Sequence, residues 1–429
     1  MQVNNIIDLE VIMTIFNAKK ISTFVVILFA LFITNTVNAQ DAMNTKGKIS
    51  YEELWHLKID TKFEGRPTID GDHLYVGGED GILRKINRTT GKQVWQYDAG
   101  AAIGSSVSID YERAYFSAWD GSVHAVFKNK GNLAWRFKTN GEKHWDAWDH
   151  RLSTPAVDNM NVYFGSGDHN IYSVHNITGA LRWKVETGAI VHTEPTLYGE
   201  RVVIGSYDGK LYSIDRYNGT IQWVFKTTGN RYFRNGAIGG DVLIDDGIAY
   251  FGTRDYNLYA VLMQTGTGAW NYRTPSWVNS KPVIKDDTVY ISNSNTPNLM
   301  AVKKSDGRLK WQTPLKKNSY GRAVLIGDTH VAVADQDGHI YVMDTKNGEI
   351  DLTYLTPSAR KNYKDFYDET GPINEFVNGS FTEYSEYHFD RLNKLGAISA
   401  GLVNDGDIIY FSNSGGDIVA LKILGVAKK

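Results

Sequence analysis

A repeating unit of about forty residues runs through the chain. Each copy begins at an Asp-Gly-like turn, continues as an alternating strand, and reaches a Gly that is followed four residues later by Trp, as in DGILRKINRTTGKQVW. The eight copies begin at Asp80, Asp120, Asp168, Asp208, Asp255, Thr296, Asp337 and Gly415. A fixed period of this length, with several short strands per unit, is typical of a propeller. The sequence therefore predicts an all-β fold, an eight-bladed β-propeller of four-stranded blades.

The tryptophans indicate how the predicted ring closes. Six copies end in Trp, the seventh has Leu352 at that position, and the copy at Gly415 runs out of chain before its Trp. One additional Trp, Trp55 in LWHLKI, precedes the first copy. We therefore expect the N-terminal strand to complete the C-terminal blade, which leaves no open strand edge. The repeat tryptophans are expected to pack between blades: Trp95, Trp135, Trp183, Trp223, Trp270 and Trp311.

The strand-Gly-x-x-x-Trp unit resembles the PQQ-like propeller repeat, which quinoprotein alcohol dehydrogenases share with the lipoprotein of the Bam outer-membrane assembly complex. The resemblance covers nearly the whole chain after residue 50 and implies the fold more than the function, because one fold hosts many chemistries. Quinoprotein dehydrogenases are longer, and many carry an adjacent cysteine pair, whereas this sequence has no cysteine. We therefore expect no PQQ and no other organic cofactor, and the need for a divalent metal stays open.

The N-terminal segment has the order of a secretory signal. Lys19 and Lys20 precede the apolar run 21–33, and a small-residue site ends at Ala39. This predicts cleavage after Ala39, a linker over 40–49, a propeller over 50–425, and a periplasmic or secreted protein, with a retained membrane anchor as the alternative. We expect no lipid anchor, since no cysteine follows the cleavage site. The 48 acidic and 46 basic residues nearly cancel, so we expect no nucleic-acid partner. No feature predicts the oligomeric state.

The irregular loops fall on one face of the predicted ring. The Asp-Gly turns and the blade-to-blade connections share this face because successive strands alternate in direction. Relative to the basic repeat, 8 extra residues lie in NGEKHWDAWDHRLSTP, 7 at GNRYFRNGAIGGD, and 38 between the seventh and eighth copies. Long loops on a rigid scaffold often carry function. We predict a lid-like insertion over 355–396 between blades 7 and 8, with a species-specific insertion as the alternative.

Residues suited to acid–base chemistry gather on the same face. Six are predicted to be catalytic: His150, His169, His192, Tyr207, Arg231 and Arg234. Six more are predicted to bind substrate: Trp119, His144, Trp145, Arg254, Tyr256 and Trp277. His169 and Tyr256 stand where other turns have Gly, and the alternative is that Asn170 and Asn257 supply the turn chemistry there. A zinc site is a further, weaker alternative because its ligands are irregularly spaced: His144, His150, His169 and His192.

These residue types suit β-elimination on uronic acids. Arg neutralises the carboxylate, while His and Tyr take the C5 proton and protonate the leaving oxygen at C4. The group is similar, in residue types and placement, to that of propeller-type ulvan lyases of marine bacteria, although those are seven-bladed. This implies a secreted carbon–oxygen lyase, a polysaccharide lyase or oligosaccharide dehydratase, whose partner is an acidic oligosaccharide such as one from ulvan. The alternative is a non-catalytic PQQ-like scaffold or binding protein of the cell envelope.

Prolines mark the start of four inner strands. Pro67, Pro155, Pro195 and Pro282 align with one another in the repeat. The residues that precede them are therefore predicted to line the central channel as a charged funnel, with a solvated channel wall as the alternative: Arg66, Thr154, Glu194 and Lys281.

Overall fold

The structure is a computed structural model that describes residues 49–146, 148–368, 371–373 and 381–426. The predicted signal peptide over 1–39, and all of the predicted linker except Ile49, lie outside the described residues. None of the helices in the described part of the chain has the length and apolar character that crossing a bilayer requires.

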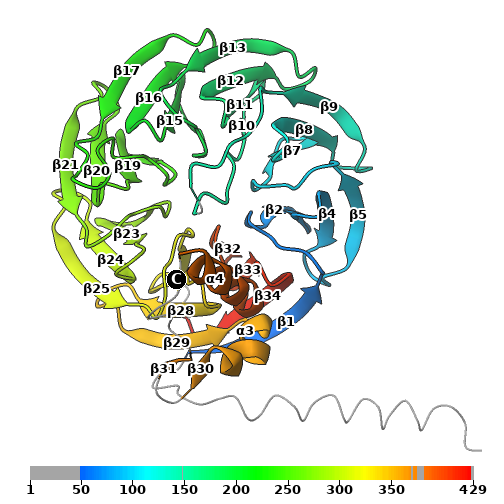
Figure 1. The fold of residues 1–429 in the computed structure, drawn as a ribbon, viewed down its shortest axis with the longest axis vertical. Helices are drawn as coiled ribbons and strands as arrows, with labels where there is room; N and C mark the ends of the chain where they lie inside the picture. The colour runs from blue at the N-terminus through cyan, green and yellow to red at the C-terminus, as the bar shows by residue number, and fades with distance from the viewer. Residues whose placement is uncertain (1–48, 147, 369–370, 374–380, 427–429) are drawn as a thin grey trace, which may run out of the picture. The chain divides into compact units, whose positions relative to one another are not determined.

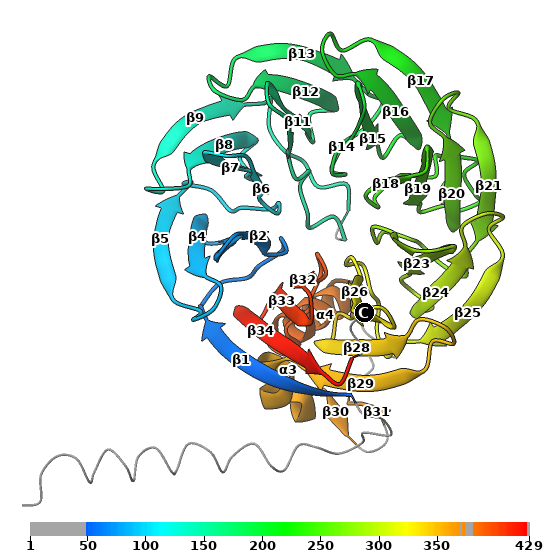
Figure 2. The same ribbon diagram turned by 180° about the vertical axis from the view of Figure 1, so that it is seen from behind.

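Eight four-stranded antiparallel sheets surround a central axis, as Figures 1 and 2 show from the two sides. This confirms the predicted all-β, eight-bladed propeller. In blades 1 to 7 the four strands follow one another along the chain, with the first strand nearest the axis and the fourth at the rim. Blade 8 combines strands from both ends of the chain.

The strands of the first four blades are short and regular. Blade 1 consists of β2 (Thr68–Asp70), β3 (His73–Gly77), β4 (Ile82–Asn87) and β5 (Gln93–Asp98). Blade 2 consists of β6 (Ser108–Ile109), β7 (Arg113–Ser117), β8 (Ser122–Phe127) and β9 (Leu133–Lys138). Blade 3 consists of β10 (Ala156–Val157), β11 (Asn161–Gly165), β12 (Asn170–His175) and β13 (Leu181–Glu186). Blade 4 consists of β14 (Thr196–Tyr198), β15 (Arg201–Gly205), β16 (Lys210–Asp215) and β17 (Ile221–Lys226).

The other four blades repeat this pattern. Blade 5 consists of β18 (Leu243–Asp245), β19 (Ile248–Gly252), β20 (Asn257–Leu262) and β21 (Gly268–Arg273). Blade 6 consists of β22 (Val283–Lys285), β23 (Thr288–Ser292), β24 (Asn298–Lys303) and β25 (Leu309–Pro314). Blade 7 consists of β26 (Val324–Ile326), β27 (His330–Ala334), β28 (His339–Asp344) and β29 (Ile350–Leu355). Blade 8 consists of β32 (Val403–Asp405), β33 (Ile408–Ser412), β34 (Asp417–Leu424) and β1 (Ser50–Lys58).

The segment between blades 7 and 8 contains its own short elements. They are α3 (Pro357–Asn362), a 3-10 turn (Tyr363–Asp365), a ribbon of β30 (Tyr367–Asp368) with β31 (Gly371–Pro372), and α4 (Phe381–Leu395). Thr356 caps α3 by accepting a hydrogen bond from the Ala359 N–H. The boundaries 355–396 of a lid-like insertion remain a prediction.

The hydrophobic core lies between neighbouring blades. The second and third strands of a blade are buried on both faces because adjacent blades pack against both. At the junction of blades 1 and 2, for example, Tyr75 and Leu83 pack against Ala114 and Phe116. The outermost strands alternate between exposed and half-buried positions, since only their edge and one face contact protein.

A tryptophan–glycine contact joins adjacent blades at seven junctions of the described ring. The Trp of each fourth strand packs on the Gly of the turn between the third and fourth strands of the next blade, and its indole N–H donates to a backbone carbonyl there. At the junction of blades 1 and 2, the Trp95 N–H lies 2.9 Å from the Lys128 oxygen. The pairs are Trp55–Gly91, Trp95–Gly131, Trp135–Gly179, Trp183–Gly219, Trp223–Gly266, Trp270–Gly307 and Trp311–Gly348.

The ring closes where β1 pairs antiparallel with β34, and Trp55 lies opposite Ala420. This confirms the predicted closure. It also explains Leu352, because the third and fourth strands of blade 8 come from opposite ends of the chain and no turn joins them. A Trp at position 352 therefore has no glycine turn to pack on. Leu352 instead packs in the core between blades 7 and 8, where the Tyr354 hydroxyl donates to Glu53 at 2.9 Å.

The tryptophan–glycine contact predicts a stability difference between two glycine substitutions. Gly131 has φ +70°, and a Cβ there would lie 2.7 Å from the Trp95 ring, whereas Gly71 has φ +54° and open space around it. Gly71→Ala is expected to lower the free energy of unfolding by about 1 kcal/mol through backbone strain alone. Gly131→Ala adds overpacking, so we expect a loss of about 2–4 kcal/mol. Equal losses in denaturant unfolding would contradict a packing role for this contact.

Candidate functional site

The connection between β9 and β10, here called the central loop (residues 140–154), reaches from blade 2 toward the axis of the ring (Figure 1). Its length comes from the predicted insertion NGEKHWDAWDHRLSTP. The loop carries three carboxylates that hold it against blades 3, 4 and 5: Glu142, Asp146 and Asp149. The site is built on these contacts.

His192 lies buried between two carboxylates of the central loop. Its Nδ1 is 3.0 Å from Asp149 Oδ1, and its Nε2 is 3.0 Å from Glu142 Oε2. Burial alone would lower the pKa of His192, but the hydrogen bonds to Asp149 and Glu142 outweigh it and raise the pKa to about 9. The imidazolium therefore donates from both nitrogens at neutral pH. A cation held in this way ties the loop to blade 4 and is not free to accept a proton.

Tyr207 and Arg254 extend this group towards blade 5. The Tyr207 hydroxyl donates to Asp149 Oδ1 at 3.2 Å, and burial raises the pKa of Tyr207 well above its usual range. The guanidinium of Arg254 forms an ion pair with Asp146. It lies 5.1 Å from the Tyr207 ring centre and 4.8 Å from that of Trp277, which are cation–π distances. Arg254 is only 1% exposed, so it connects the rings rather than facing solvent.

Aromatic side chains form a connected group around Arg254, here called the aromatic row. Its members are Trp119, Trp145, Tyr207, Phe233, Tyr256 and Trp277. Trp145 lies 5.6 Å from Tyr207, and Phe233 lies 4.9 Å from Trp277 in an edge-to-face arrangement. Trp119 stacks on His144 at 3.9 Å, and the His144 Nδ1 is 2.8 Å from the Asp149 carbonyl oxygen. Turns of blades 2, 4 and 5, the connections on either side of blade 5 and the central loop thus contribute to one connected group of side chains.

Helix α4 packs against the central loop from the opposite side of the ring. The Trp148 ring lies 4.9 Å from His388 and 6.0 Å from Phe389, and the His150 ring lies 5.4 Å from Phe389. Burial, followed by the nearby Arg391 charge, lowers the pKa of His388 to about 4. Burial likewise lowers the pKa of His150. Both imidazoles are therefore neutral packing groups at pH 7.

His169 and Tyr256 occupy the left-handed turn position themselves, with φ of 68° and 70°. Asn170 and Asn257 support these turns by donating to Asp168 and Asp255. A non-glycine residue in this conformation is strained. The Tyr256 ring lies 6.2 Å from the Phe233 ring, centre to centre.

The structure brings together only part of the predicted catalytic group. His192 and Tyr207 meet at Asp149, whereas no hydrogen bond, ion pair or ring contact within the described residues joins them to four others: His150, His169, Arg231 and Arg234. The two arginines lie exposed on the loop after β17. All six predicted substrate-binding residues belong to the aromatic row or contact it: Trp119, His144, Trp145, Arg254, Tyr256 and Trp277.

Sequence reasoning missed the three carboxylates of the central loop. They lie in the insertion NGEKHWDAWDHRLSTP, and the signal that could have found them is the presence of three acids in one long loop, which indicates ion pairing. The predicted four-histidine zinc site is not formed, since no group of three or more metal-ligating side chains in the described chain is arranged to hold an ion. Its members separate because His144 stacks on Trp119 and His192 lies between carboxylates.

A family model described as outer membrane protein assembly factor BamB matches residues 50–144, 119–350 and 276–426. The chain belongs to this family. Among individual relatives, BamB of Legionella pneumophila (strain Paris) is 28% identical over 114 residues, 26% of this chain and 29% of that protein. BamB of Shewanella oneidensis is 32% identical over 87 residues, 19% of this chain and 22% of that protein. The matched region thus spans less than a third of each of these relatives.

Solved structures agree on the fold. The crystal structure of BamB from Moraxella catarrhalis superimposes with a TM-score of 0.67 at 18% identity, over 87% of this chain and all of that one. The computationally designed protein Ika8 gives a TM-score of 0.64 at 15% identity, over 86% of this chain and 99% of the design. At these identities the likeness concerns architecture alone.

The predicted lyase activity is wrong. The family and its relatives are named as assembly factors and not as enzymes, which overturns the carbon–oxygen lyase, the link to ulvan and polysaccharide degradation, and the acidic oligosaccharide as partner. The geometry supplies a physical reason. His192 is held as a cation by two carboxylates, and the high pKa of buried Tyr207 keeps its proton in place. The PQQ-like part of the resemblance is confirmed.

The two carboxylates that hold His192 as a cation lead us to expect a pH dependence of stability. Its pKa is raised in the folded state, so its contribution is complete below the unfolded pKa near 6.5 and is lost as pH rises through about 9. The free energy of unfolding should therefore fall by up to about 3 kcal/mol between pH 6.5 and 9.5. His192→Gln should be less stable at pH 6.5 and should lose this slope. Denaturant unfolding across that range tests it, and parallel profiles for both proteins would contradict the assignment.

Proposed function

We propose that the protein is a non-catalytic scaffold of the cell envelope that binds other proteins during the assembly of outer-membrane proteins. The observation that carries this proposal is the family match, which extends over every blade of the ring, residues 50–426. The names of the relatives describe assembly at the outer membrane. A location in the envelope agrees with the secretory signal expected at the N-terminus.

The aromatic row is the surface that best suits a protein partner. Trp, Tyr and Arg are the residue types that most often dominate binding energy at interfaces. Trp145 is 45% exposed and Tyr232, next to Phe233 of the row, is 73% exposed. Arg231 and Arg234 flank Tyr232, are exposed, and form no ion pair with any described residue. A polypeptide with apolar and acidic side chains is the partner that this combination favours.

The central loop makes this surface rigid. His192, Tyr207 and Arg254 each bind a carboxylate of the loop, and α4 packs on Trp148 and His150. A long loop that is already ordered loses little conformational entropy when a partner binds, so more of the contact energy contributes to affinity. The contacts that hold His192 as a cation and order the loop therefore favour a docking role.

The scaffold proposal predicts an effect on the outer membrane of the source organism. Deleting the gene should lower the quantity of β-barrel proteins in outer-membrane fractions, measured by quantitative mass spectrometry. The wild-type gene should restore the level, whereas a Trp145→Ala/Tyr232→Ala variant should restore it only in part. Removing two such aromatic anchors is expected to weaken docking by about 2 kcal/mol or more, roughly thirtyfold.

Tyr111→Ala is the matched control, because Tyr111 is 94% exposed in the turn between β6 and β7 on the other face of the ring. It should restore the level fully. Unchanged β-barrel content after deletion would contradict the scaffold function itself. If the folded double variant fully restored the level of β-barrel proteins, the scaffold function would stand, but the docking surface would lie elsewhere on the protein.

A further inference from the structure

One residue per blade forms a layer around the axial channel, here called the channel ring. Each member stands two positions before the innermost strand of its blade. In blade order they are Arg66, Ser106, Thr154, Glu194, Asp241, Lys281, Arg322 and Gly401. Neighbours in the ring are linked: Arg66 N–H donates to Ser106 Oγ at 3.0 Å, and Glu194 N–H donates to Asp241 Oδ1 at 2.9 Å. The predicted charged funnel is thus observed, with more members than the prolines indicated.

The charges of the channel ring do not cancel. Two cations share one carboxylate, since Arg66 Nη2 lies 3.1 Å from Glu194 Oε2 and Lys281 Nζ lies 3.0 Å from Glu194 Oε1. Burial would raise the pKa of Glu194, but Lys281 and Arg66 lower it to about 2, so this carboxylate stays ionised. With Asp241 and Arg322 included, the ring holds three cations and two carboxylates.

Arg322 is the cation without a counterion. Among the described residues no carboxylate lies within ion-pair distance of it, and its buried Nε has no hydrogen-bond partner. Its backbone is fixed, because the Leu402 N–H donates to the Arg322 oxygen at 3.1 Å. The next member of the ring, Gly401, has no side chain to place beside Arg322. Arg322 is half-buried, and a partly desolvated guanidinium without a carboxylate partner favours an anion beside it.

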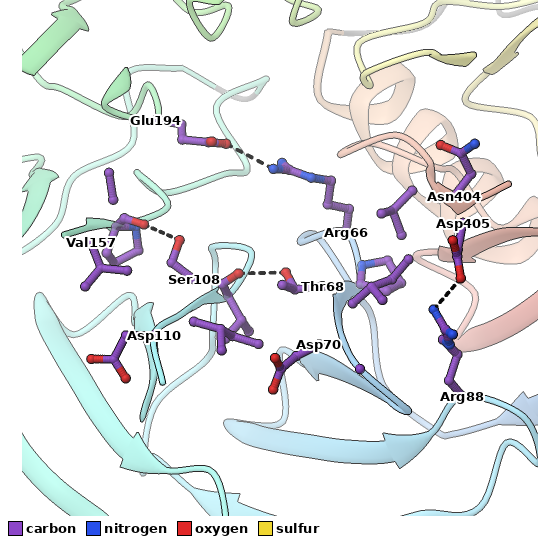
Figure 3. A pocket seen from close by; sticks show the side chains of 18 of the residues that line it. Arg66, Thr68, Asp70, Arg88, Ser108, Asp110, Val157, Glu194, Asn404 and Asp405 are labelled. Atoms are coloured by element: carbon purple, nitrogen blue, oxygen red, sulfur yellow. Dashed lines mark hydrogen bonds and ion pairs between the residues drawn. The ribbon is translucent and has the colours of Figure 1, made fainter. Parts of the chain in front are cut away.

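A cavity of about 790 Å³ provides access to this position. Its wall includes Arg66, Glu194 and Arg322, together with the turn that follows the inner strand of blade 1 and the inner strand of blade 8 itself, so it opens on the face opposite the central loop. Four further carboxylates and a third arginine also line it: Asp70, Asp72, Asp110, Asp405 and Arg88. Figure 3 shows Arg66 reaching to Glu194 inside the cavity and Arg88 paired with Asp405 at its edge. A volume of this size is in the range of small-molecule sites.

We propose that the channel ring binds an oxyanion, a carboxylate or phosphate group, between Arg66 and Arg322. Arg322 presents the planar fork of donors that matches such a group. This site is independent of the aromatic row and of the scaffold function, because it lies at the other end of the channel and shares no residue with that surface.

Isothermal titration calorimetry of the whole chain tests the site, in phosphate-free buffer of low ionic strength. The probes are inorganic phosphate, N-acetyl-diglycine with its free carboxylate, and the C-terminal amide of the same peptide. Saturable binding of phosphate, of the free peptide, or of both supports the site and identifies the group that it accepts. The amide should not bind. Absence of saturable binding of either oxyanion up to tens of millimolar overturns the proposal.

Two variants that are expected to change the affinity in opposite directions make the test specific. Arg322→Gln should weaken binding at least tenfold, and Glu194→Gln should tighten it, because one removes a cation and the other a carboxylate of the same ring. Arg308→Gln is the matched control for lost charge, since Arg308 is 85% exposed and outside the cavity; it should bind as the wild type does. Thermal unfolding verifies that each variant is folded. Wild-type affinity in folded Arg322→Gln, or unchanged or weaker binding in folded Glu194→Gln, overturns the assignment.

Discussion

The indole of one blade lying on the glycine turn of the next is the contact on which the rest of the molecule depends. It combines three requirements in one place: a flat ring, a turn without a Cβ at positive φ, and a carbonyl that accepts the indole N–H, as in Trp183 with Gly219 and Arg216. Because the same geometry recurs at seven junctions of the described ring, each blade has the same offset from its neighbour. The loops between blades then emerge at fixed positions around the axis. The aromatic row and the channel ring are both products of that regular offset.

The repeat made the fold predictable, whereas the site depended on contacts between distant residues. The spacing of Gly91 and Trp95 within one copy already indicates a propeller, and even the exception at Leu352 follows from ring closure. In contrast, Arg254 and Asp146 are 108 positions apart, and His192 and Glu142 are 50 apart. Residue type alone therefore made His192 resemble a base, although its two carboxylate partners hold it as a cation.

The channel ring, too, could be predicted only in part from the sequence. Prolines revealed Arg66, Thr154, Glu194 and Lys281, but Asp241 and Arg322 escaped notice because Val242 and Ala323 follow them where those four blades have Pro. All eight members of the channel ring are found by counting back two residues from the first residue of each inner strand. That count requires exact strand boundaries, which a sequence provides only approximately. Partly buried charges of this kind are costly unless paired, so the ion pairs of Glu194 fix the positions of Arg66 and Lys281, and the unpaired Arg322 is the basis of the proposed oxyanion site.

The pairing of β1 with β34 has a consequence for the order of folding. Ser50 pairs with Leu424, so the last blade forms only after nearly the whole described chain is available. Until then the ring is an open arc whose two end blades expose apolar faces, and closing it brings together segments with a very large separation in sequence, which is slow. Blades 1 to 7 are each contiguous and can form early, whereas the closing step is the late event. Such a chain is most prone to aggregation before closure, while these apolar faces are exposed. The edge of β34 that later pairs with β1 is the strand edge that stays unpaired longest.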